Sequence, residues 1–194
     1  MHKKFDELEF LVIVQTLQIP DVKIVTPKKF GDERGFFSET YSRQGLIEHA
    51  IDLTFVQDNQ SLSAQVGTLR GLHFQLPPFA QDKLVRVTRG AIYDVAVDIR
   101  RQSPTFGQWV GAVISADEWN QILVPIGFAH GFCTIEPDTE VLYKVTAPYA
   151  PASERGIAWD DPDLAIDWPL QGGQPVLSGK DGENPTLAHS SDLF

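Results

Sequence analysis

One histidine, His73, and one lysine, Lys83, stand in the segment GTLRGLHFQLPPFAQDKLVRVTRG at 67–90. Lys83 heads an apolar strand pattern and has the same parity as Val85 and Val87, so it points inward if the valines do. A buried ammonium is costly unless it is paired. The simpler interpretation is therefore a strand-end lysine whose head reaches water. The alternative is a functional cation inside a pocket.

An inward lysine beside an inward histidine is suited to removing a proton from a carbon next to a carbonyl. The imidazole takes the proton as general base, and the ammonium stabilises the enolate oxygen that forms. Taken alone, His73 also fits a hydrogen-bonded core histidine. Arg70 faces the opposite side of a regular strand, and a bulge at Gly71 is needed to turn both side chains into one cavity.

A second segment, PIGFAHGF at 125–132, forms a tight turn followed by His130. Together the two segments resemble the paired motifs of the cupin superfamily, in which two early histidines, a glutamate and a late histidine hold a metal ion. Here Gln75 replaces the second early histidine, and Lys83 stands where the glutamate would be. An amide is a poor transition-metal ligand and an ammonium repels a cation. We therefore expect no metal, with a fixed positive charge in its place.

The elements that must hold these residues are short strands separated by turn residues. Strand patterns occur at 22–26, 35–41, 84–88, 91–99, 109–115, 121–125 and 141–146. In the pattern at 91–99, apolar residues alternate with Asp94 and Asp98, which predicts a strand buried on one face only. A short helix is expected at 44–50. Many brief strands at this spacing predict an all-β jelly-roll sandwich or barrel with a few short helices.

The chain of 194 residues is expected to form a single domain over 1–194. Residues 1–16 have the character of an N-terminal extension that could add a strand. The Gly-, Pro- and Ser-rich segment at 171–194 has the composition of a loose tail.

The formal net charge is −10, with 16 Lys and Arg against 26 Asp and Glu. This excess argues against general affinity for nucleic acid or anionic membranes, so an anionic ligand must be held by a local basic cluster. Cys133 is the single cysteine, which excludes an intramolecular disulfide and fits a reducing compartment. The apolar run from Phe10 to Val14 is too short for a signal-peptide core or a membrane span. We therefore expect a soluble cytoplasmic protein.

Seven motifs, in order, resemble the dTDP-4-dehydrorhamnose 3,5-epimerase family over roughly 19–181. They are GDERGFFSETY at 31–41, FVQDNQS at 55–61, TLRGLHFQ at 68–75, PIGFAHGF at 125–132, LYKVT at 142–146, SERGIAWDDP at 153–162 and SGKD at 178–181. The resemblance implies an isomerase that inverts C3 and C5 of dTDP-4-keto-6-deoxy-D-glucose on the way to dTDP-L-rhamnose. It also implies a jelly-roll homodimer that uses no cofactor or metal, with an N-terminal segment crossing to the partner.

The resemblance further implies a role for each matching residue. His73 would be the general base and Asp181 its partner carboxylate, which requires the segment at 171–194 to fold back to the site. Tyr143 would return the proton from the opposite side, with Tyr149 as its rival, and Lys83 would stabilise the enolate. The residues expected to bind the nucleotide sugar are Arg34, Glu39, Gln57, Asn59, Arg70, Lys83, His130, Glu154 and Lys180.

Three alternatives stay open on the sequence. One is a sibling enzyme that epimerises C3 or C5 alone, because proton access at each carbon depends on the pose of the sugar. Another is a non-catalytic dTDP-sugar-binding cupin, which the joint presence of the four catalytic residues argues against. The third is a metal-dependent cupin oxygenase, which Gln75 and Lys83 argue against. Two departures from the family pattern are Phe74, where tyrosine is frequent, and TAPYAP at 146–151 near Tyr143.

Overall fold

The structure is a computed structural model that describes residues 11–194. Residues 1–10, part of the predicted extension, lie outside the described residues. The elements are β1 (Val12–Thr16), β2 (Lys23–Pro27), β3 (Phe30–Asp32), β4 (Gly35–Phe37), α1 (Arg43–Ile47), β5 (Gln57–Ser63), β6 (Leu69–Gln75), β7 (Lys83–Arg89), β8 (Ala91–Asp98), β9 (Trp109–Ser115), β10 (Gln121–Val124), β11 (Phe128–Thr134), β12 (Thr139–Val145) and β13 (Glu154–Gly156), with short 3₁₀ turns η1 (Pro151–Ser153), η2 (Asp181–Glu183) and η3 (Leu187–His189).

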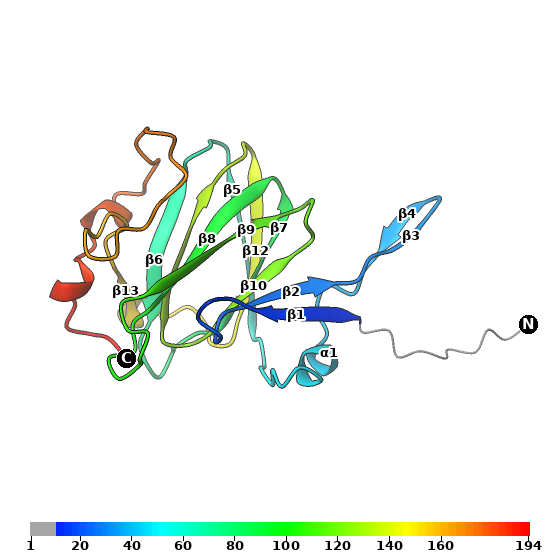
Figure 1. Cartoon of the computed structure of the whole chain (residues 1–194), viewed down its shortest axis with the longest axis horizontal. Helices are drawn as coiled ribbons and strands as arrows, with labels where there is room; N and C mark the ends of the chain where they lie inside the picture. Colours follow the sequence, from blue (N-terminus) through cyan, green and yellow to red (C-terminus); the bar gives the residue numbers. More distant parts are fainter. Residues whose placement is uncertain (1–10) are drawn as a thin grey trace, which may run out of the picture.

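Two antiparallel sheets face each other and enclose the main core (Figure 1). One sheet has the order β1-β2-β10-β7-β12-β5, and the other has the order β13-β6-β11-β8-β9. Val85 and Val87 of β7 pack between them against Ile92 of β8 and Val141 of β12. The predicted all-β sandwich is therefore confirmed, and the inward parity of β7 is the one that the sequence pattern requires.

Strand β8 differs from the prediction of a half-buried strand. It lies between β11 and β9, and its even-numbered side faces the interior of the sandwich, where Ile92 and Ala96 join the core. Asp94 and Asp98 share that side and are fully buried. The opposite side of β8 packs in a second apolar cluster beneath the C-terminal segment. Because both faces are covered, the alternation of polar and apolar residues did not indicate solvent here.

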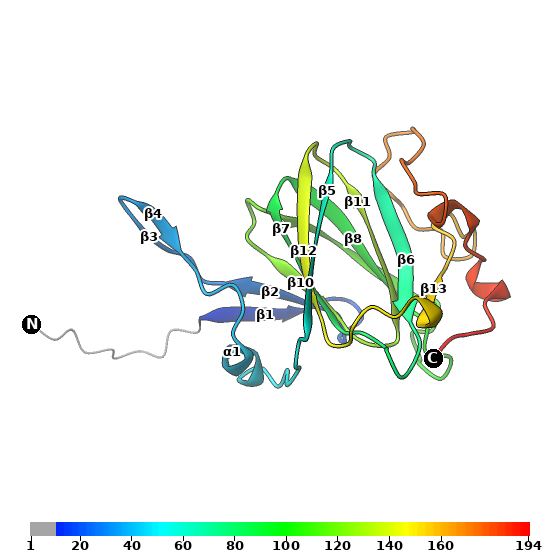
Figure 2. The ribbon, with the colours of Figure 1, turned by 180° about the vertical axis from the view of Figure 1, so that it is seen from behind.

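The C-terminal segment at 171–194 is not a loose tail. It folds back beside β6 and β13, on the outer side of the five-stranded sheet (Figure 2). Leu177, Leu187 and Phe194 pack in the apolar cluster of that outer face. The amide of Arg101 donates a hydrogen bond to the Phe194 carbonyl oxygen over 2.8 Å. The polar composition of this segment therefore hides a few apolar anchors that fix its course.

The described part of the predicted extension contributes β1, which pairs antiparallel with β2 at the edge of the six-stranded sheet. The strand expected at 35–41 is right only for its first three residues, which form β4. Strands β3 and β4 pair with each other and project from the sandwich as a separate hairpin (Figures 1 and 2). The residues after β4 leave this hairpin, so they have no neighbouring strand with which to continue the ladder.

The short helix predicted at 44–50 is confirmed as α1. Its N-cap is Ser42, whose hydroxyl oxygen accepts a hydrogen bond from the Gly45 amide over 3.3 Å. Leu46 is the buried residue of this helix and packs on the outer face of the six-stranded sheet with Leu84 and Leu123. Across residues 11–194, none of the helices has the length and apolar character needed to cross a membrane.

Candidate active site

A bulge in β6 turns Arg70 and His73 toward the same cavity. The register between β6 and β11 shifts between the pairs His73–His130 and Arg70–Phe132, because two residues of β6, 71 and 72, stand opposite one residue of β11. Gly71 makes this possible, since its φ is +134° and an added Cβ would lie 2.5 Å from the Cα of Gly131. Arg70 and His73 both line the resulting hollow. The bulge that the sequence interpretation required is therefore present.

The hollow has a volume of about 290 Å³ and opens between the two sheets. A second hollow of about 250 Å³ shares four of its lining residues. The predicted site residues that line one or both are Gln57, Asn59, Arg70, His73, Lys83, His130, Tyr143, Tyr149, Glu154, Lys180 and Asp181. They come from six strands, the loop after β12 and the C-terminal segment, so the site exists only in the assembled sandwich.

His73 and Asp181 form a hydrogen-bonded pair. The His73 Nε2 lies 2.5 Å from Oδ1 of Asp181, and the other carboxylate oxygen accepts a hydrogen bond from the Ser178 hydroxyl over 2.9 Å. Burial acts to raise the pKa of Asp181, but the hydrogen bonds from His73 and Ser178 outweigh burial and hold the pKa below its ordinary value. An ionised Asp181 accepts the proton on Nε2, which leaves Nδ1 of His73 as the basic nitrogen.

Lys83 points into the cavity, as the inward interpretation predicted. Its side chain is half-buried, and its Nζ donates a hydrogen bond to the His73 carbonyl oxygen over 3.3 Å. Burial lowers the pKa of Lys83 to about 8, and the nearby charges of Asp94 and Glu154 offset part of that effect. The side chain therefore keeps its charge at neutral pH and loses it under mildly alkaline conditions.

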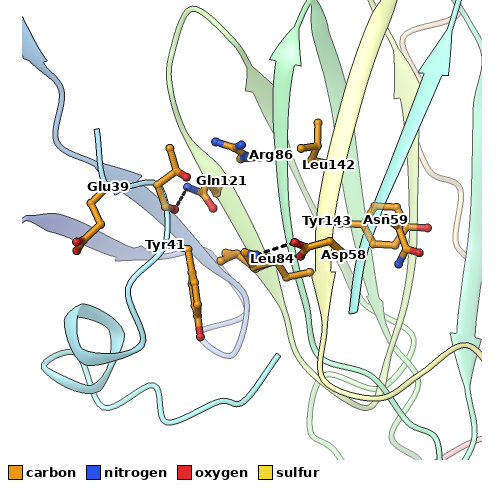
Figure 3. Close-up of a pocket in the computed structure, with 11 residues that line it drawn as sticks. Glu39, Tyr41, Asp58, Asn59, Leu84, Arg86, Gln121, Leu142 and Tyr143 are labelled. Carbon is orange, nitrogen blue, oxygen red and sulfur yellow. Dashed lines mark hydrogen bonds and ion pairs between the residues drawn. The ribbon is translucent and has the colours of Figure 1, made fainter. Parts of the chain in front are cut away.

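The two tyrosines considered for proton return have different surroundings. Tyr143 is half-buried, lines both hollows and has its pKa raised by burial. Tyr143 and Asn59 also line a third pocket, the one that contains Glu39, and Figure 3 shows them at the end of it far from Glu39. Tyr149 is 54% exposed, and its hydroxyl donates a hydrogen bond to Glu154 over 2.7 Å, which raises its pKa.

Two predicted binding residues lie elsewhere in the chain. Arg34 stands at the tip of the β3–β4 hairpin, where its side chain is 85% exposed and pairs with Asp32. Glu39 lines a different pocket, of about 350 Å³, together with the outward residues Arg86 and Leu142 (Figure 3). Within one chain, neither Arg34 nor Glu39 belongs to the hollows that His73 lines.

Gln75, which stands at a metal-ligand position of the cupin frame, has a different use. Its side-chain nitrogen donates hydrogen bonds to the carbonyl oxygens of Phe79 and Pro148 over 2.7 and 3.2 Å. Its side-chain oxygen accepts one from the Ala150 amide over 2.8 Å. The amide thus ties two loops together. No group of three or more His, Cys, Asp or Glu side chains suited to a metal ion occurs within residues 11–194.

Three residues of the site were not identified from the sequence. The Ser61 hydroxyl is buried in the hollow and has no hydrogen-bond partner among residues 11–194. Ser178 supports Asp181, as described above. Asp94 lies behind the hollow and pairs with His130. The signal for Asp94 was available, because a carboxylate that alternates with valines in a central strand must face either water or a polar partner.

Comparisons with known proteins show which family the chain is similar to. The family model described as dTDP-4-dehydrorhamnose 3,5-epimerase matches residues 16–189. A relative of that name from Sinorhizobium fredii is 53% identical over 184 residues, which cover 95% of this chain and 92% of the relative.

Two solved structures are similar to the whole fold. The dTDP-4-dehydrorhamnose 3,5-epimerase of Bacillus anthracis, with TDP and PPi bound, has a TM-score of 0.87 and 50% identity, covering 90% of this chain and 99% of that chain. The dTDP-6-deoxy-D-glucose-3,5-epimerase of Legionella pneumophila, in complex with dTDP-4-keto-L-rhamnose, has a TM-score of 0.87 and 48% identity, covering 92% of this chain and 94% of that chain.

Proposed function

Since this chain belongs to the dTDP-4-dehydrorhamnose 3,5-epimerase family, we propose that it inverts C3 and C5 of dTDP-4-keto-6-deoxy-D-glucose without a cofactor, as a step toward dTDP-L-rhamnose. The observation that carries the proposal is the convergence of His73, Lys83 and Tyr143 on one hollow. A base, a cation and an acid are the three groups that inversion next to a ketone requires.

His73 is the proposed base. Both carbons that invert flank the C4 ketone, which acidifies their protons. Nδ1 of His73 takes the proton, and the Asp181 carboxylate on Nε2 stabilises the imidazolium that forms. The electron pair of the broken C–H bond moves toward the ketone oxygen. The ammonium of Lys83 stabilises the negative charge that develops on this oxygen.

Tyr143 is the proposed acid. Inversion requires a proton to arrive on the face opposite the one that was deprotonated. His73 stands on β6 of one sheet and Tyr143 on β12 of the other, so the two side chains approach the hollow from opposite walls. Because its pKa is raised, the Tyr143 phenol keeps its proton at neutral pH. Tyr149 is less suited, since its hydroxyl already donates to Glu154.

The nucleotide diphosphate is proposed to bind along the basic part of the cavity wall. Arg70 and Lys180 line the same hollow as His73 and form a local positive site in an acidic protein. A guanidinium suits a diphosphate because its planar fork presents paired donors. Gln57 and Asn59 line the adjoining hollow and offer amide groups to the rest of the nucleotide.

Arg34 and Glu39 are proposed to serve the site of a partner subunit in a homodimer. The β3–β4 hairpin projects from the sandwich and leaves Phe36 56% and Phe37 70% exposed. Exposed aromatic residues on a protruding hairpin favour burial against another chain. This hairpin carries Arg34 at its tip. If the hairpin crosses to the other subunit, it brings Arg34 to that subunit's cavity, which accounts for the distance between Arg34 and the cavity of its own chain.

The reaction can be tested by following C3 and C5 of the keto sugar by NMR in heavy water with purified protein. We expect solvent deuterium at both carbons. His73→Asn abolishes the exchange, and Tyr143→Phe impairs epimerisation while Tyr149→Phe retains it. Deuterium at one carbon only would assign the chain to the single-centre epimerases. Tight dTDP binding with no exchange at either carbon would make it a silent binding protein.

A further inference from the structure

Asp94 is a buried carboxylate that the mechanism above does not use. It is fully buried on the inward side of β8, among core residues such as Ile92 and Ala96. An unpaired ion in such a place is costly, so its charge requires a compensating partner. Among residues 11–194, its hydrogen-bond partner is the ring of His130, whose Nε2 lies 2.9 Å from each carboxylate oxygen.

This contact fixes the ring of His130. An ionised carboxylate only accepts hydrogen bonds, so the nitrogen that faces it must carry a proton. His130 is itself buried and lines the hollow, while Asp94 stands behind it. Asp94 therefore acts on the site through a side chain that reaches the cavity, in the manner of a carboxylate that orients a histidine.

Lys83 is the second group that the charge of Asp94 influences. The charged and titratable groups that line the hollows with Lys83 or act on its charge are Arg70 and His73 from β6, Asp94 from β8, His130 from β11, Tyr143 from β12, Tyr149 from the loop after β12, Glu154 from β13, and Lys180 and Asp181 from the C-terminal segment. Three of these groups are carboxylates, so the negative charge that can balance the Lys83 ammonium comes from Asp94, Glu154 and Asp181.

All three carboxylates have hydrogen-bond partners. Asp181 accepts from His73, and Glu154 accepts hydrogen bonds from Lys180 and Tyr149. Asp94 pairs with His130 and, like Asp181, has no direct ion pair with a lysine or arginine among residues 11–194. Its charge raises the pKa of Lys83 and is the larger of the two such effects on this lysine.

We propose that Asp94 is a positioning residue of this site, whose buried carboxylate orients the ring of His130 and places a negative charge behind the hollow that Lys83 lines. The inference rests on the proposed function only in that the charge of Lys83 matters for stabilising the enolate. The electrostatic part can be measured without any turnover, so its failure can be told apart from failure of the proposed reaction.

The direct test is NMR titration of Lys83 in protein labelled with 13C at the lysine Cε, with the signal assigned by its loss in Lys83→Met. In the unmodified protein we expect a midpoint near pH 8. Asp94→Asn keeps the shape of the side chain but removes its charge, and it moves the midpoint down by about one pH unit. Asp94→Ser serves the same purpose if the Asn variant does not fold.

Asp98→Asn is the matched control, because Asp98 is an equally buried aspartate on the same side of β8 that bonds Arg100 instead of His130. We expect the Lys83 midpoint to stay in place in this variant. An unchanged midpoint in Asp94→Asn, or an equal fall in Asp98→Asn, would overturn the counter-charge role.

Two kinetic readouts, the pH profile of kcat and the value of KM, separate positioning from a merely structural role. The charged form of Lys83 exists below its midpoint, so a lower midpoint brings the alkaline loss of kcat to lower pH. A fall of one unit from 8 leaves about one tenth of the lysine charged at pH 8 instead of half, a loss of about fivefold there. The second readout is KM, measured over the same pH range, which we expect to change little in Asp94→Asn.

The orienting role is tested by 15N NMR of the histidine rings, with His130 assigned by loss of its signals in His130→Gln. We expect Nε2 of His130 to carry a proton in the unmodified protein and this preference to weaken in Asp94→Asn. An unprotonated Nε2 in the unmodified protein would overturn the orienting role, since the carboxylate would then have no donor to accept from.

Discussion

At the scale of single residues, the cavity separates three tasks among groups with different surroundings. His73 is half-buried and tied to a carboxylate, whereas Tyr143 is shielded enough to retain its proton. Lys83 stands between a burial effect that weakens its charge and two carboxylates that support it. Tyr143 and Lys83 are therefore held in the protonation states that their proposed tasks require near neutral pH.

The pairing of His73 with Asp181 leads to a prediction for Asp181→Asn. The amide can donate a hydrogen bond to Nε2, which would place the ring proton on Nδ1 and block the basic nitrogen. We expect kcat to fall by about 100-fold or more with little change in KM. Steady-state kinetics alongside Asp192→Asn gives the comparison, since Asp192 pairs with Arg155 at the surface of the same segment. Full activity in Asp181→Asn would mean that the base works without its carboxylate.

At the scale of elements, the bulge in β6 is the device that brings a cation and a base together. A regular strand would place Arg70 and His73 on opposite faces, and the extra residue removes that conflict. The close approach of β6 to β11 at Gly71 leaves no room for a side chain.

Replacing Gly71 with alanine should therefore break the element that forms the site. Gly71→Ala adds a Cβ 2.5 Å from backbone atoms at a φ of +134°, and we expect a loss of about 3 kcal/mol or more in the free energy of unfolding. Urea denaturation measures it. Gly35→Ala is the control, because Gly35 has a φ of +127° but open space around it, and should lose about 1 kcal/mol. Equal losses in the two variants would show that the backbone angle, and not the contact with β11, decides the cost.

The end of β8 carries a pH-dependent contribution to stability. Burial acts to raise the pKa of Asp98, but hydrogen bonds from Arg100, Ser103 and Thr105 prevail and lower the pKa from 3.8 to about 2. The ionised Asp98 carboxylate therefore stabilises the fold fully above its pKa in the unfolded chain. This stabilisation is lost as pH falls through its lower pKa in the folded protein. We expect the free energy of unfolding of Asp98→Asn at pH 7 to be about 2 kcal/mol lower than that of the unmodified protein. Denaturation curves of the two proteins should converge between pH 4 and pH 2, and a constant difference would contradict the linkage.

Element by element, sequence reasoning succeeded where local pattern decides structure. The alternation in β7 placed Lys83 on the face of Val85 and Val87, although its position at the strand end favoured a head that reaches water. The capped turn at Ser42 agrees with the predicted helix. It failed at β8, because parity says which residues share a face but not whether another layer covers that face. It also misjudged 171–194 by composition, since the apolar anchors of that segment have no regular spacing.

At the scale of the whole molecule, the site draws on residues that are distant in sequence and, in our proposal, on a second chain. The motif that contains Arg34 pointed to the right family but not to a place beside His73. Residues in a projecting hairpin carry no periodic signal that tells whether they serve their own chain or a partner. That distinction requires the three-dimensional arrangement.

Subunit mixing tests the proposed exchange. We expect Arg34→Ala and His73→Asn to be strongly impaired as separate proteins. In a dimer with one chain of each kind, one cavity receives an intact His73 and an intact arm, so equal mixing with free exchange should restore about one quarter of the activity. Measured turnover after denaturation and joint refolding provides the readout. Mixing His73→Asn with Asp181→Asn is the control, since both changes affect the same cavity and no intact site can form. Absence of recovery in the first mixture would place Arg34 in its own chain or outside the site.

The course of the C-terminal segment has a consequence for how the protein matures in the cell. The ribosome makes the strands that carry the imidazole, the ammonium and the phenol well before it reaches Asp181, which docks beneath His73 as part of that late segment. A polypeptide made only as far as residue 170 therefore has the histidine without its carboxylate partner, and it lacks the apolar residues of that segment that cover the outer face of the five-stranded sheet. In our proposal, a working site therefore requires the chain to extend at least as far as Asp181, whose carboxylate holds the ring of the base.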